Sequence, residues 1–461
     1  MYQFKKIHFV GIGGIGMSGI ATVLKNMGYK ITGSDIKESE TVKRLKKLGI
    51  KVFIGHSKDN IDETDVVVFS SAVKPDNPEI IKAKSLGIPV IPRAEMLAEL
   101  CRLKYSILVA GAHGKTTTTS LIATVLSEAG FDPTVVVGGK LKSIGTNARL
   151  GQGEFLVAEA DESDGSFLKL SPAIAVITNI DREHLDYFKN LRRIKKAFLE
   201  FANKVPFYGV SILCRECRHI RDLIPNLSRR YLTYGFDEES DFYSKKISFK
   251  APYVFFEAFY KNKSLGKFTL TVPGKHNVLN SLAVIAMAKE LSIPLDTVKD
   301  SLKNFTGIGR RFEFKGEKRG IKFYDDYGHH PTEIKAVLKT AMWFKPERVC
   351  VIFQPHRYTR TRDLMDDFIK VFKQVLRKRD ILFLMDIYPA SEAPIEGVRG
   401  DVLYERLKNS GVNVRFNPDK EGIKEEILKE LREGDIVFTI GAGDVYKIGE
   451  AVRDRLQDEQ V

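Results

Sequence analysis

Short hydrophobic runs alternate with longer stretches in which hydrophobic residues recur at helical spacing, from one end of the chain to the other. This alternation is typical of parallel β-sheets that are covered by helices. In the first part of the chain it predicts strands at residues 7–10, 30–33, 52–55 and 66–70, followed by a helix at 94–103. We therefore expect an α/β protein that begins with a parallel sheet.

The same alternation continues after residue 105. Predicted strands lie at 106–110, 155–159 and 173–178, and they are followed by an alternating, antiparallel pattern at 249–271 and a helix at 278–291. Gly307, Gly309, Arg310 and Arg311 are typical of a hinge. Beyond them, strands are predicted at 322–325, 349–353, 381–385 and 436–441. We expect three α/β domains, at residues 1–100, 101–307 and 308–461.

Length and composition agree with a folded chain of several domains. At a prior of about 150 residues per domain, 461 residues correspond to two or three domains, and 43% of the residues are hydrophobic. This composition argues against long disordered or collagen-like segments. No hydrophobic run approaches the roughly 20 residues that span a bilayer, so we expect a cytoplasmic protein without membrane insertion.

The net charge is +14, from 73 Lys and Arg against 59 Asp and Glu. Such a surplus is compatible with nucleic acid, a membrane surface or anionic small molecules as partners. The basic residues are scattered, have acidic neighbours and are not interleaved with aromatic residues. This pattern favours an ordinary solvated surface over a nucleic-acid interface.

Four cysteines do not form a disulfide framework, and their number fits a reducing compartment. Cys214 and Cys217 form a C-x-x-C pair with His219 close by, which is compatible with zinc. No second pair lies at the spacing of a zinc finger or ribbon, so we interpret these residues as ordinary thiols.

The first predicted strand is followed directly by a glycine-rich loop. Gly11, Gly13 and Gly16 form the pattern G-x-G-x-x-G, and Asp35 follows at the end of the second predicted strand. Glycines here let backbone N–H groups approach a diphosphate, and Asp35 can accept a hydrogen bond from a ribose hydroxyl. The loop predicts a diphosphate ligand, but it does not decide between NAD and another nucleotide diphosphate. A tight packing turn is the structural alternative.

A second loop joins the strand at 106–110 to a helix. It consists of Gly111, Ala112, His113, Gly114, Lys115 and Thr116. The pattern resembles a P-loop, in which backbone N–H groups and the lysine bind phosphates and the threonine hydroxyl contacts magnesium. Val109 stands where the first glycine of the usual P-loop pattern would be. We interpret the loop as a phosphate site that departs from the general motif.

Acidic residues follow the next two strands. Glu159 ends the strand at 155–159 and begins a run of acids, and His184 follows the strand at 173–178. Because the carboxyl ends of parallel strands meet at one edge of a sheet, we expect Glu159 and His184 to lie near Lys115. Carboxylates and an imidazole at this edge predict a magnesium site. A solvated acidic turn is the alternative.

Most histidines occur in polar motifs. They are His113, His184, His276, His329, His330 and His356. Asn277 and Asn280 begin a helix, where their amides can present donors and acceptors to the edge of a base, although helix capping would also explain them. The group of His356, Arg357, Arg360 and Arg362 follows a strand and predicts capture of a carboxylate or phosphate.

These motifs, taken in order along the whole chain, resemble those of the Mur ligases. The resemblance rests on the segments beginning at Gly11, Gly111, Glu159, His276, Gly309, Asp325 and His356. It implies a Rossmann-like N-terminal domain, a central P-loop-type ATPase domain with a mixed sheet, and a Rossmann-like C-terminal α/β domain. The last domain is expected to close over the other two.

The resemblance implies a set of ligand-binding residues. For the UDP-sugar they are Gly11, Gly13, Gly14, Ile15, Gly16, Asp35 and Ser71. For ATP they are Gly111, Ala112, His113, Gly114, Lys115, Thr116, Thr117, Asn277, Asn280, Arg311 and Asp325. For the amino acid they are Arg357, Arg360 and Tyr327, and for magnesium they are Thr116, Glu159 and His184.

The resemblance also implies a reaction. The lactyl carboxylate of UDP-N-acetylmuramate attacks the γ-phosphate of ATP, and the amine of L-alanine attacks the resulting acyl phosphate. Lys115, magnesium and Arg311 would neutralise charge during phosphoryl transfer. The resemblance leaves the base that takes the proton of the amine open, and the positions of His329 and His330 make them the candidates. The catalytic set expected from the sequence is therefore Lys115, Glu159, His184, Arg311, His329 and His330.

Other classes of protein explain less of the sequence. A nicotinamide oxidoreductase would account for the first glycine loop but not for Gly114, Lys115 and Thr116. An ATPase or kinase would account for the middle domain alone, and a nucleic-acid-binding protein only for the charge. Within the family, ligases that recycle a tripeptide or add Glu or diaminopimelate share much of the framework.

Overall fold

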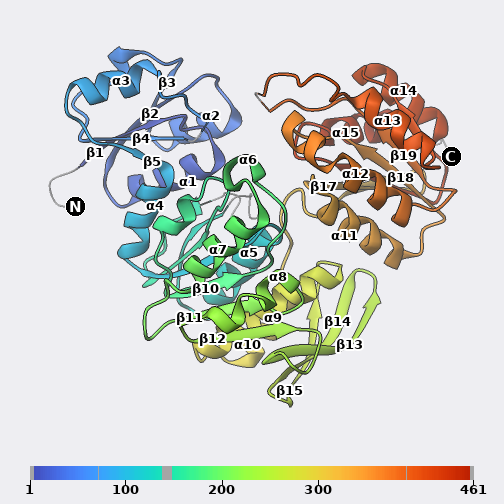
Figure 1. The fold of residues 1–461 in the computed structure, drawn as a ribbon, viewed down its shortest axis with the longest axis horizontal. Helices are drawn as coiled ribbons and strands as arrows, with labels where there is room; N and C mark the ends of the chain where they lie inside the picture. Colours follow the sequence, from blue (N-terminus) through green and yellow to red (C-terminus); the bar gives the residue numbers. More distant parts are fainter. Residues whose placement is uncertain (1–4, 71, 138–147, 391, 457–461) are drawn as a thin grey trace. The chain divides into compact units, whose positions relative to one another are not determined.

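The computed structural model describes residues 5–70, 72–137, 148–390 and 392–456. The chain divides into two compact units (Figure 1). Unit 1 consists of Met1–Ser248, Phe255–Thr271 and Asn277–Thr306, and unit 2 of Phe249–Val254, Val272–His276 and Gly307–Val461. Unit 1 contains the first sheet and most of the central sheet, and the three domain boundaries expected from the sequence stay predictions.

The first sheet of unit 1 is entirely parallel, with strand order β3-β2-β1-β4-β5. Its strands are β1 (Lys6–Val10), β2 (Lys30–Asp35), β3 (Lys51–Ile54), β4 (Val66–Phe69) and β5 (Val90–Pro92). Its helices are α1 (Ile15–Asn26), α2 (Glu40–Lys47), α3 (Pro78–Ser85) and α4 (Arg93–Arg102), with a 3-10 turn at Lys58–Asn60. The strand order reverses direction at β1, the position where open α/β sheets bind ligands.

The central sheet has the order β15-β14-β13-β12-β11-β10-β6-β9-β7-β8. Its first strands are β6 (Tyr105–Ala110), β7 (Thr134–Val136), β8 (Ala148–Arg149), β9 (Phe155–Glu159), β10 (Ile174–Ile177), β11 (Val210–Cys214) and β12 (Tyr231–Gly235). The strands β13 (Phe242–Lys250), β14 (Tyr253–Tyr260) and β15 (Lys263–Leu270) are joined by two-residue connections, which only antiparallel neighbours allow. Its helices are α5 (Lys115–Glu128), α6 (Leu185–Phe188), α7 (Leu191–Ala202), α8 (Arg218–Arg221), α9 (Lys275–Glu290) and α10 (Leu295–Asn304). The sheet is therefore mixed, as expected.

Unit 2 contains a third sheet, of order β16-β17-β21-β18-β19-β20. Its strands are β16 (Glu313–Lys318), β17 (Ile321–Asp326), β18 (Arg348–Phe353), β19 (Ile381–Leu384), β20 (Val414–Phe416) and β21 (Asp435–Ile440). Its helices are α11 (Pro331–Ala341), α12 (Tyr358–Val375), α13 (Gly400–Asn409), α14 (Lys420–Glu430) and α15 (Tyr446–Arg455). All strand pairs are parallel except β16 with β17.

Alternate residues of the strands in unit 2 face opposite helix layers. Val349, Val351 and Phe353 pack with α11, α12 and α13, whereas Cys350 and Ile352 pack with α14 and α15. This period of two explains why the strand reads as a continuous hydrophobic run, since both of its faces are buried. The third sheet thus lies between two layers of helices. With the two sheets of unit 1, it confirms the expected three-domain α/β fold class.

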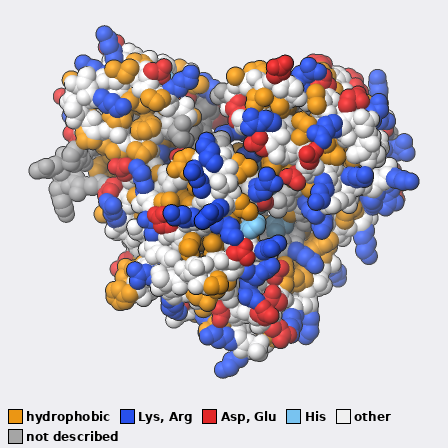
Figure 2. Space-filling view, viewed as in Figure 1, with side chains coloured by type: hydrophobic (Ala, Val, Ile, Leu, Met, Phe, Trp, Pro, Cys, Tyr) orange, Lys and Arg blue, Asp and Glu red, His pale blue; other side chains and the backbone are white. Residues whose placement is uncertain are grey.

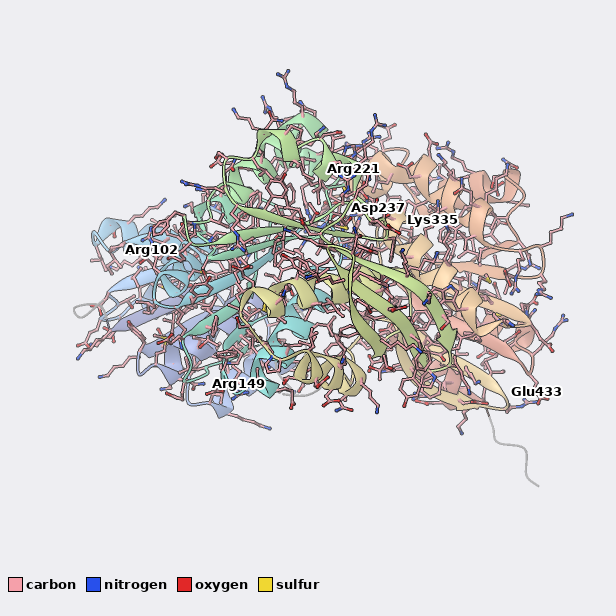
Figure 3. The ribbon with its side chains drawn as sticks, turned by 90° about the horizontal axis from the view of Figure 1, so that it is seen from below. Arg102, Arg149, Arg221, Asp237, Lys335 and Glu433 are labelled. Atoms are coloured by element: carbon pink, nitrogen blue, oxygen red, sulfur yellow. The ribbon has the colours of Figure 1, made fainter. Side chains whose placement is uncertain are left out.

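Charged residues surround these layers. Figure 3 draws them around the outside of each unit, for example Arg102 and Arg221 in unit 1 and Glu433 in unit 2, all of which are exposed. On the face shown in Figure 2, Lys and Arg side chains are scattered among Asp and Glu side chains. None of the helices in the described part of the chain combines the length and hydrophobicity that crossing a membrane requires.

Candidate active site

The glycine loop after β1 is closed by the end of β2. Gly11 has φ +77° and donates its N–H to the carbonyl of Ser34 at 2.8 Å, and Gly13 donates to Asp35 Oδ2 at 2.8 Å. A Cβ atom on Gly13 would lie 2.7 Å from that same oxygen, so a side chain at 13 would displace the carboxylate. Asp35 therefore fixes the shape of the loop in this structure.

The first turn of α1 lies beside a cation that the sequence pattern did not single out. A Cβ atom on Gly16 would lie 2.7 Å from Nη1 of Arg93, and Arg93 Nη2 lies 3.2 Å from Asp161 Oδ2. Arg93 thus brings positive charge to the helix end at which a diphosphate is expected. Of the other predicted UDP-sugar residues, Gly14 precedes α1 and Ile15 begins it, while Ser71 lies outside the described residues.

The phosphate loop joins β6 to α5, and two of its glycines have no room for a side chain. Gly111 has φ +132°, and a Cβ atom there would lie 2.1 Å from Thr178 Oγ1. Gly114 has φ +83°, and a Cβ atom there would lie 2.9 Å from Asn280 Oδ1. These values lie in the region that disfavours residues with a side chain. The loop is thus shaped both by backbone conformation and by its neighbours.

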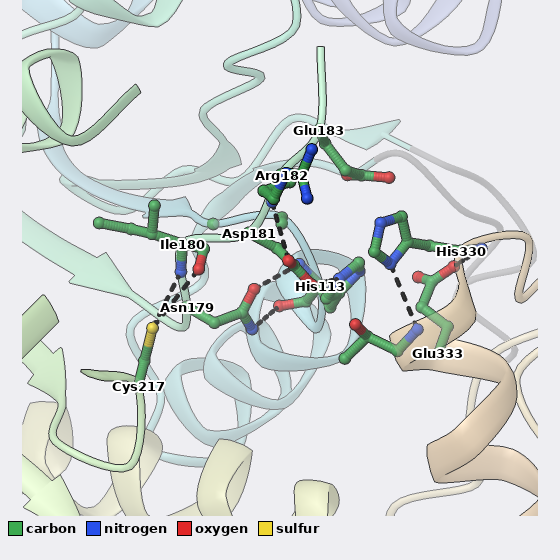
Figure 4. A network of polar contacts seen from close by, with 12 residues as sticks. His113, Asn179, Ile180, Asp181, Arg182, Glu183, Cys217, His330 and Glu333 are labelled. Atoms are coloured by element: carbon green, nitrogen blue, oxygen red, sulfur yellow. Dashed lines mark hydrogen bonds and ion pairs between the residues drawn. The ribbon is translucent and has the colours of Figure 1, made fainter. Parts of the chain in front are cut away.

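Side chains at the end of β10 hold the middle of this loop (Figure 4). The amide of Asn179 accepts from the N–H of His113 at 2.9 Å and donates to its carbonyl at 2.8 Å. His113 Nε2 lies 3.0 Å from Asp181 Oδ2. The imidazole of His113 is therefore anchored beside the loop, with Ala112 before it and Thr116 and Thr117 in the first turn of α5.

Lys115 forms a buried ion pair. Its Nζ lies 2.9 and 3.0 Å from the two carboxylate oxygens of Glu162 and donates to the carbonyl of Gly111 at 2.6 Å. Burial would lower the pKa of Lys115, but the carboxylates of Glu162, Asp161 and Glu183 outweigh it and raise the pKa. Lys115 is therefore a permanent cation in the loop.

A group of possible metal ligands lies at the carboxyl edge of the same sheet. The ligand atoms of Glu162, Glu183 and His184 all lie within 4.8 Å of one another. The sequence prediction named His184 with Thr116 and Glu159, which lie in the first turn of α5 and at the last position of β9. Glu162 and Glu183 were not predicted as ligands, although both lie in the polar segments that the sequence analysis identified.

Asn277 and Asn280 lie in the first turns of α9 and are buried. Asn280 Nδ2 donates to Asn277 Oδ1 at 3.1 Å, and Asn280 Oδ1 faces Gly114. The structure therefore brings Asn280, from a distant segment, against the phosphate loop. An adenine contact of either amide stays a prediction.

In unit 2, Arg310 is held by its own domain. Its guanidinium donates to Asp325 Oδ2 at 2.9 Å and to the carbonyls of Gly441 and Gly443 at 2.6 and 3.0 Å. Asp325 also accepts from Thr439 Oγ1 at 2.6 Å and is only 1% exposed. Arg310 and Asp325 therefore stabilise the loops at the carboxyl edge of the third sheet, and the binding of ATP by Asp325 stays a prediction.

Arg311 and the two predicted histidines lie around Glu333. Arg311 Nη1 is 3.5 Å from Glu333 Oε1, and its guanidinium lies 5.3 Å from the ring centroid of Tyr327. His330 Nδ1 caps α11 by accepting from the N–H of Thr332 at 3.3 Å. His329 donates its backbone N–H to Glu333 Oε2 at 3.0 Å.

The segment after β18 presents an arginine in a strained conformation. Arg357 has φ +72° and ψ +136°, and its N–H donates to the carbonyl of Tyr388 at 2.8 Å. Strain of this kind persists where the surroundings over-determine a conformation, and it is frequent at functional sites. Among the described residues, the Arg357 side chain has no hydrogen-bonding partner, so its guanidinium is available to a ligand.

A stacked pair of rings lies next to Arg357. The rings of His356 and Tyr388 are 5.4 Å apart and nearly parallel, and Arg360 Nη1 lies 3.3 Å from His356 Nδ1. Burial, together with the nearby His329, Arg360 and Arg357, lowers the pKa of His356 to about 3. His356 is therefore neutral at physiological pH and adds no positive charge to the site.

One cysteine of the C-x-x-C pair contacts the segment that follows β10. Cys217 Sγ lies 3.4 Å from the N–H and 3.5 Å from the carbonyl of Ile180, and Cys214 is buried (Figure 4). Within the described ranges, neither cysteine belongs to a group of three potential metal ligands. The interpretation of both residues as ordinary thiols stays a prediction.

Family models match the chain in three consecutive segments. Residues 6–105 match the catalytic domain of the Mur ligase family, residues 109–288 the Mur ligase middle domain, and residues 310–443 the Mur ligase glutamate ligase domain. These segments include the glycine loop, the phosphate loop and the arginine cluster of unit 2.

Named relatives match from end to end. The UDP-N-acetylmuramate–L-alanine ligase of Geotalea daltonii is 53% identical over 99% of both chains, and that of Geobacter sulfurreducens is 52% identical over 99% of this chain and 98% of the relative. Among solved structures, the UDP-N-acetylmuramate-alanine ligase of Thermotoga maritima is 32% identical, with a TM-score of 0.82 over 98% of each chain. A murein peptide ligase of Psychrobacter arcticus, 23% identical with a TM-score of 0.70, shares the fold over 98% of each chain.

Proposed function

The chain belongs to the Mur ligase family, and from this premise we propose that it is an ATP-dependent ligase that joins L-alanine to UDP-N-acetylmuramate. The observation that carries the proposal is the 53% identity over 99% of both chains with relatives that bear this activity in their names. The reaction belongs to peptidoglycan precursor synthesis. The geometry supports it at each of the three sets of residues described above.

The first step is phosphoryl transfer. The lactyl carboxylate of UDP-N-acetylmuramate attacks the γ-phosphorus of ATP, the bond to the bridging oxygen breaks, and ADP leaves an acyl phosphate behind. This activation is needed because hydroxide is a poor leaving group. Backbone N–H groups of the loop from Gly111 to Thr116 bind the phosphates, and Lys115 offsets the charge that develops on them.

The residues at the sheet edge fit a magnesium ion. Glu162 and Glu183 offer the hard oxygen ligands that magnesium prefers, and His184 adds a nitrogen, all within 4.8 Å. Thr116 and Glu159 complete the set that we expect around it. When bound, magnesium supplies positive charge to the phosphates of ATP.

The second step forms the amide. The amine of L-alanine attacks the carbonyl carbon of the acyl phosphate, inorganic phosphate leaves, and one proton leaves the nitrogen. Arg357 and Arg360 bind the alanine carboxylate, with Tyr327 nearby, because a planar guanidinium matches a carboxylate. The neutral His356 lets the ammonium form of the substrate approach without repulsion.

One histidine suits proton transfer better than the other. His330 is buried, and its Nδ1 accepts the capping hydrogen bond from Thr332, so the proton of a neutral His330 ring is on Nε2. His329 is less buried, and its Nδ1 lies 3.1 Å from the carbonyl of Tyr327, to which it can only donate, so Nε2 is the nitrogen that can take a proton. We therefore assign the acceptance of the amine proton to His329.

Phosphate release tests the proposal directly. The protein is incubated with ATP, magnesium and UDP-N-acetylmuramate, and each amino acid is added in turn. We expect phosphate release and a ninhydrin-negative UDP-sugar product with L-alanine. The tripeptide L-alanyl-γ-D-glutamyl-meso-diaminopimelate is the decisive competitor, because a ligase named for that substrate from Neisseria meningitidis matches 67% of this chain at 30% identity. Turnover with the tripeptide but not with L-alanine would refute the assignment.

A further inference from the structure

One carboxylate of unit 2 contacts residues that the sequence placed in the catalytic set. Glu333 is the third residue of α11, and its side chain is 11% exposed. Its Oε2 accepts from the backbone N–H groups of His329 at 3.0 Å and His330 at 3.3 Å, and its Oε1 lies 3.5 Å from Arg311 Nη1. Figure 4 shows Glu333 next to His330 at the start of the helix. Glu333 itself was not predicted as a site residue.

Helix capping explains part of this arrangement. Glu333 and the N-cap residue His330 form a capping box, in which each side chain accepts from the backbone of the other residue. A glutamine at the third position of a helix makes the same contact, so capping does not require a negative charge. The contacts of Glu333 with the guanidinium of Arg311 and with the ring of His329 lie outside the capping box. These two partners favour a charged carboxylate.

One nitrogen of the His329 ring lies near Glu333. His329 Nδ1 is 3.1 Å from the carbonyl of Tyr327, which can only accept a hydrogen bond, and 3.6 Å from Glu333 Oε2. Nδ1 therefore carries the hydrogen of the neutral ring, and Nε2 is the nitrogen that takes up a proton. A proton on Nε2 gives the ring a positive charge, and Glu333 then forms an ion pair with it through Nδ1.

The surroundings of His329 are rich in cations. The rings of His329 and His356 are 5.9 Å apart. Burial lowers the pKa of His356, and His329 lowers it further together with three arginines, which are Arg360, Arg357 and Arg310. A base beside His356 therefore gains its proton close to these arginines. The carboxylate of Glu333 offsets part of the resulting repulsion.

We propose that Glu333 is a positioning residue of the amide-forming step. Its carboxylate holds the backbone of His329, and it offsets the positive charge of the His329 ring when Nε2 accepts the proton of the L-alanine amine. The proton leaves the substrate nitrogen and stays on Nε2, so Glu333 remains ionised and is not itself the base. This inference rests on the proposed function and on the assignment of His329 within it.

Two nucleophiles separate the steps at which Glu333 can act. The full chain is incubated at pH 8 with ATP, magnesium and UDP-N-acetylmuramate, and either L-alanine or hydroxylamine is added. Hydroxylamine is uncharged at this pH and converts an acyl phosphate to a hydroxamate and phosphate without prior removal of a proton. L-alanine carries an ammonium group that must lose a proton before its nitrogen attacks. Hydroxamate formation therefore reports phosphoryl transfer, whereas amide formation reports both steps.

Glu333→Gln keeps the size and the capping contact of the side chain and removes its charge. We expect kcat for amide formation to fall about 10- to 100-fold, with hydroxamate formation and the melting temperature close to those of the wild type. The KM values for ATP and L-alanine should change little. Asp419→Asn is the matched control, because Asp419 accepts from the N–H of Gly422 at 2.6 Å at the N-cap of α14. This exchange of a carboxylate for an amide should leave both reactions unchanged.

Two results would overturn the inference. Amide formation at the wild-type rate in Glu333→Gln would mean that Glu333 acts as a helix cap alone. An equal loss of amide and hydroxamate formation would place its effect at phosphoryl transfer, through Arg311. If Glu333→Gln does not fold, His329→Ala provides the second test, because it should lose amide formation selectively. Loss of both reactions or of neither in His329→Ala would leave Glu333 without a charge to offset, and the inference would fail.

The wild type decides the proposed function before any variant is compared. If it forms no amide from L-alanine, the proposed function fails. If it forms the amide and Glu333→Gln gives one of the two overturning results, the inference fails and the proposed function stands.

Discussion

The ammonium group of Lys115 lies within 3.0 Å of both carboxylate oxygens of Glu162, and both side chains are largely shielded from water. The lysine that we propose to bind the phosphates of ATP is thus held in place by an acidic residue from the segment that follows β9. Removing one member of a buried ion pair leaves the charge of the other uncompensated. This costs more folding free energy than removing one member of a surface pair.

Lys115→Ala should abolish ATP-dependent amide formation while UDP-N-acetylmuramate still binds, because the first sheet does not depend on Lys115. Phosphate release and the dissociation constant of the UDP-sugar are the two measurements. Lys104→Ala is the matched control. Lys104 also bonds backbone carbonyls, those of Gly151 and Gly153 at 3.1 and 2.6 Å, but at the amino end of β6. Retained phosphate release in Lys115→Ala would contradict the assignment of the phosphate loop.

Gly114→Ala should weaken ATP binding through two effects. The φ angle of +83° costs roughly 1–2 kcal/mol for a residue with a Cβ atom, and the new Cβ atom would meet Asn280 Oδ1 at 2.9 Å. Gly130→Ala separates them, since Gly130 has φ +80° and no atom within 4 Å of an added Cβ. Both variants should lower the melting temperature, but only Gly114→Ala should raise the KM for ATP, by about tenfold or more. Equal KM values for ATP in Gly114→Ala and Gly130→Ala would show that Asn280 does not constrain the loop.

Features that are local in the sequence could be predicted. The buried strands β6 and β18 read as continuous hydrophobic runs, and both glycine loops are contiguous segments between a strand and a helix. In contrast, β16 has the sequence EFKGEK and lies at the edge of its sheet, so it carries no hydrophobic run that would reveal it.

Features that depend on tertiary contacts could not be predicted. Glu79 accepts a hydrogen bond from Ser34, which lies 45 residues away in the sequence, and its position in a short helix reads as an ordinary exposed acid. The hydrogen bond from Arg310 to the carbonyl of Gly441 joins two residues that are 131 positions apart in the sequence. The sequence indicated which residue types occur at each sheet edge, but not which of them neutralise one another.

Arg357→Ala should raise the KM for L-alanine far more than the KM for ATP. Hydrogen bonds to charged groups contribute about 1.5–3 kcal/mol, so a rise of about 10- to 100-fold is expected. Steady-state kinetics with each substrate varied in turn provide the measurement. Arg362→Ala is the control, because Arg362 lies in the helix that follows Arg357 but is paired with its neighbour Asp363 at 2.8 Å. An unchanged KM for L-alanine in Arg357→Ala would remove Arg357 from the amino-acid site.

The free energy of unfolding of unit 1 should depend on pH through Glu79. Burial would raise the pKa of Glu79, but the interactions with His8, Ser34 and Asn60 outweigh burial and hold it at about 2 in the folded protein, against an ordinary value of 4.5. The unfolded chain therefore binds more protons than the folded chain between these values, and stability rises with pH across this range. The contribution is complete above pH 4.5 and is lost as the pH falls towards 2. The difference between these two pKa values corresponds to about 3 kcal/mol in the free energy of unfolding.

Melting temperatures of the wild type and Glu79→Gln, measured from pH 6 to pH 3, test this dependence. The wild type should melt at a higher temperature at pH 6, and the gap should narrow as the pH falls, because the variant has no carboxylate to protonate at this position. Glu40→Gln is a suitable control, since Glu40 pairs with Lys43 on the exposed face of α2 and should show only a small gap. A gap for Glu79→Gln that stays constant down to pH 3 would mean that Glu79 is not ionised in the fold.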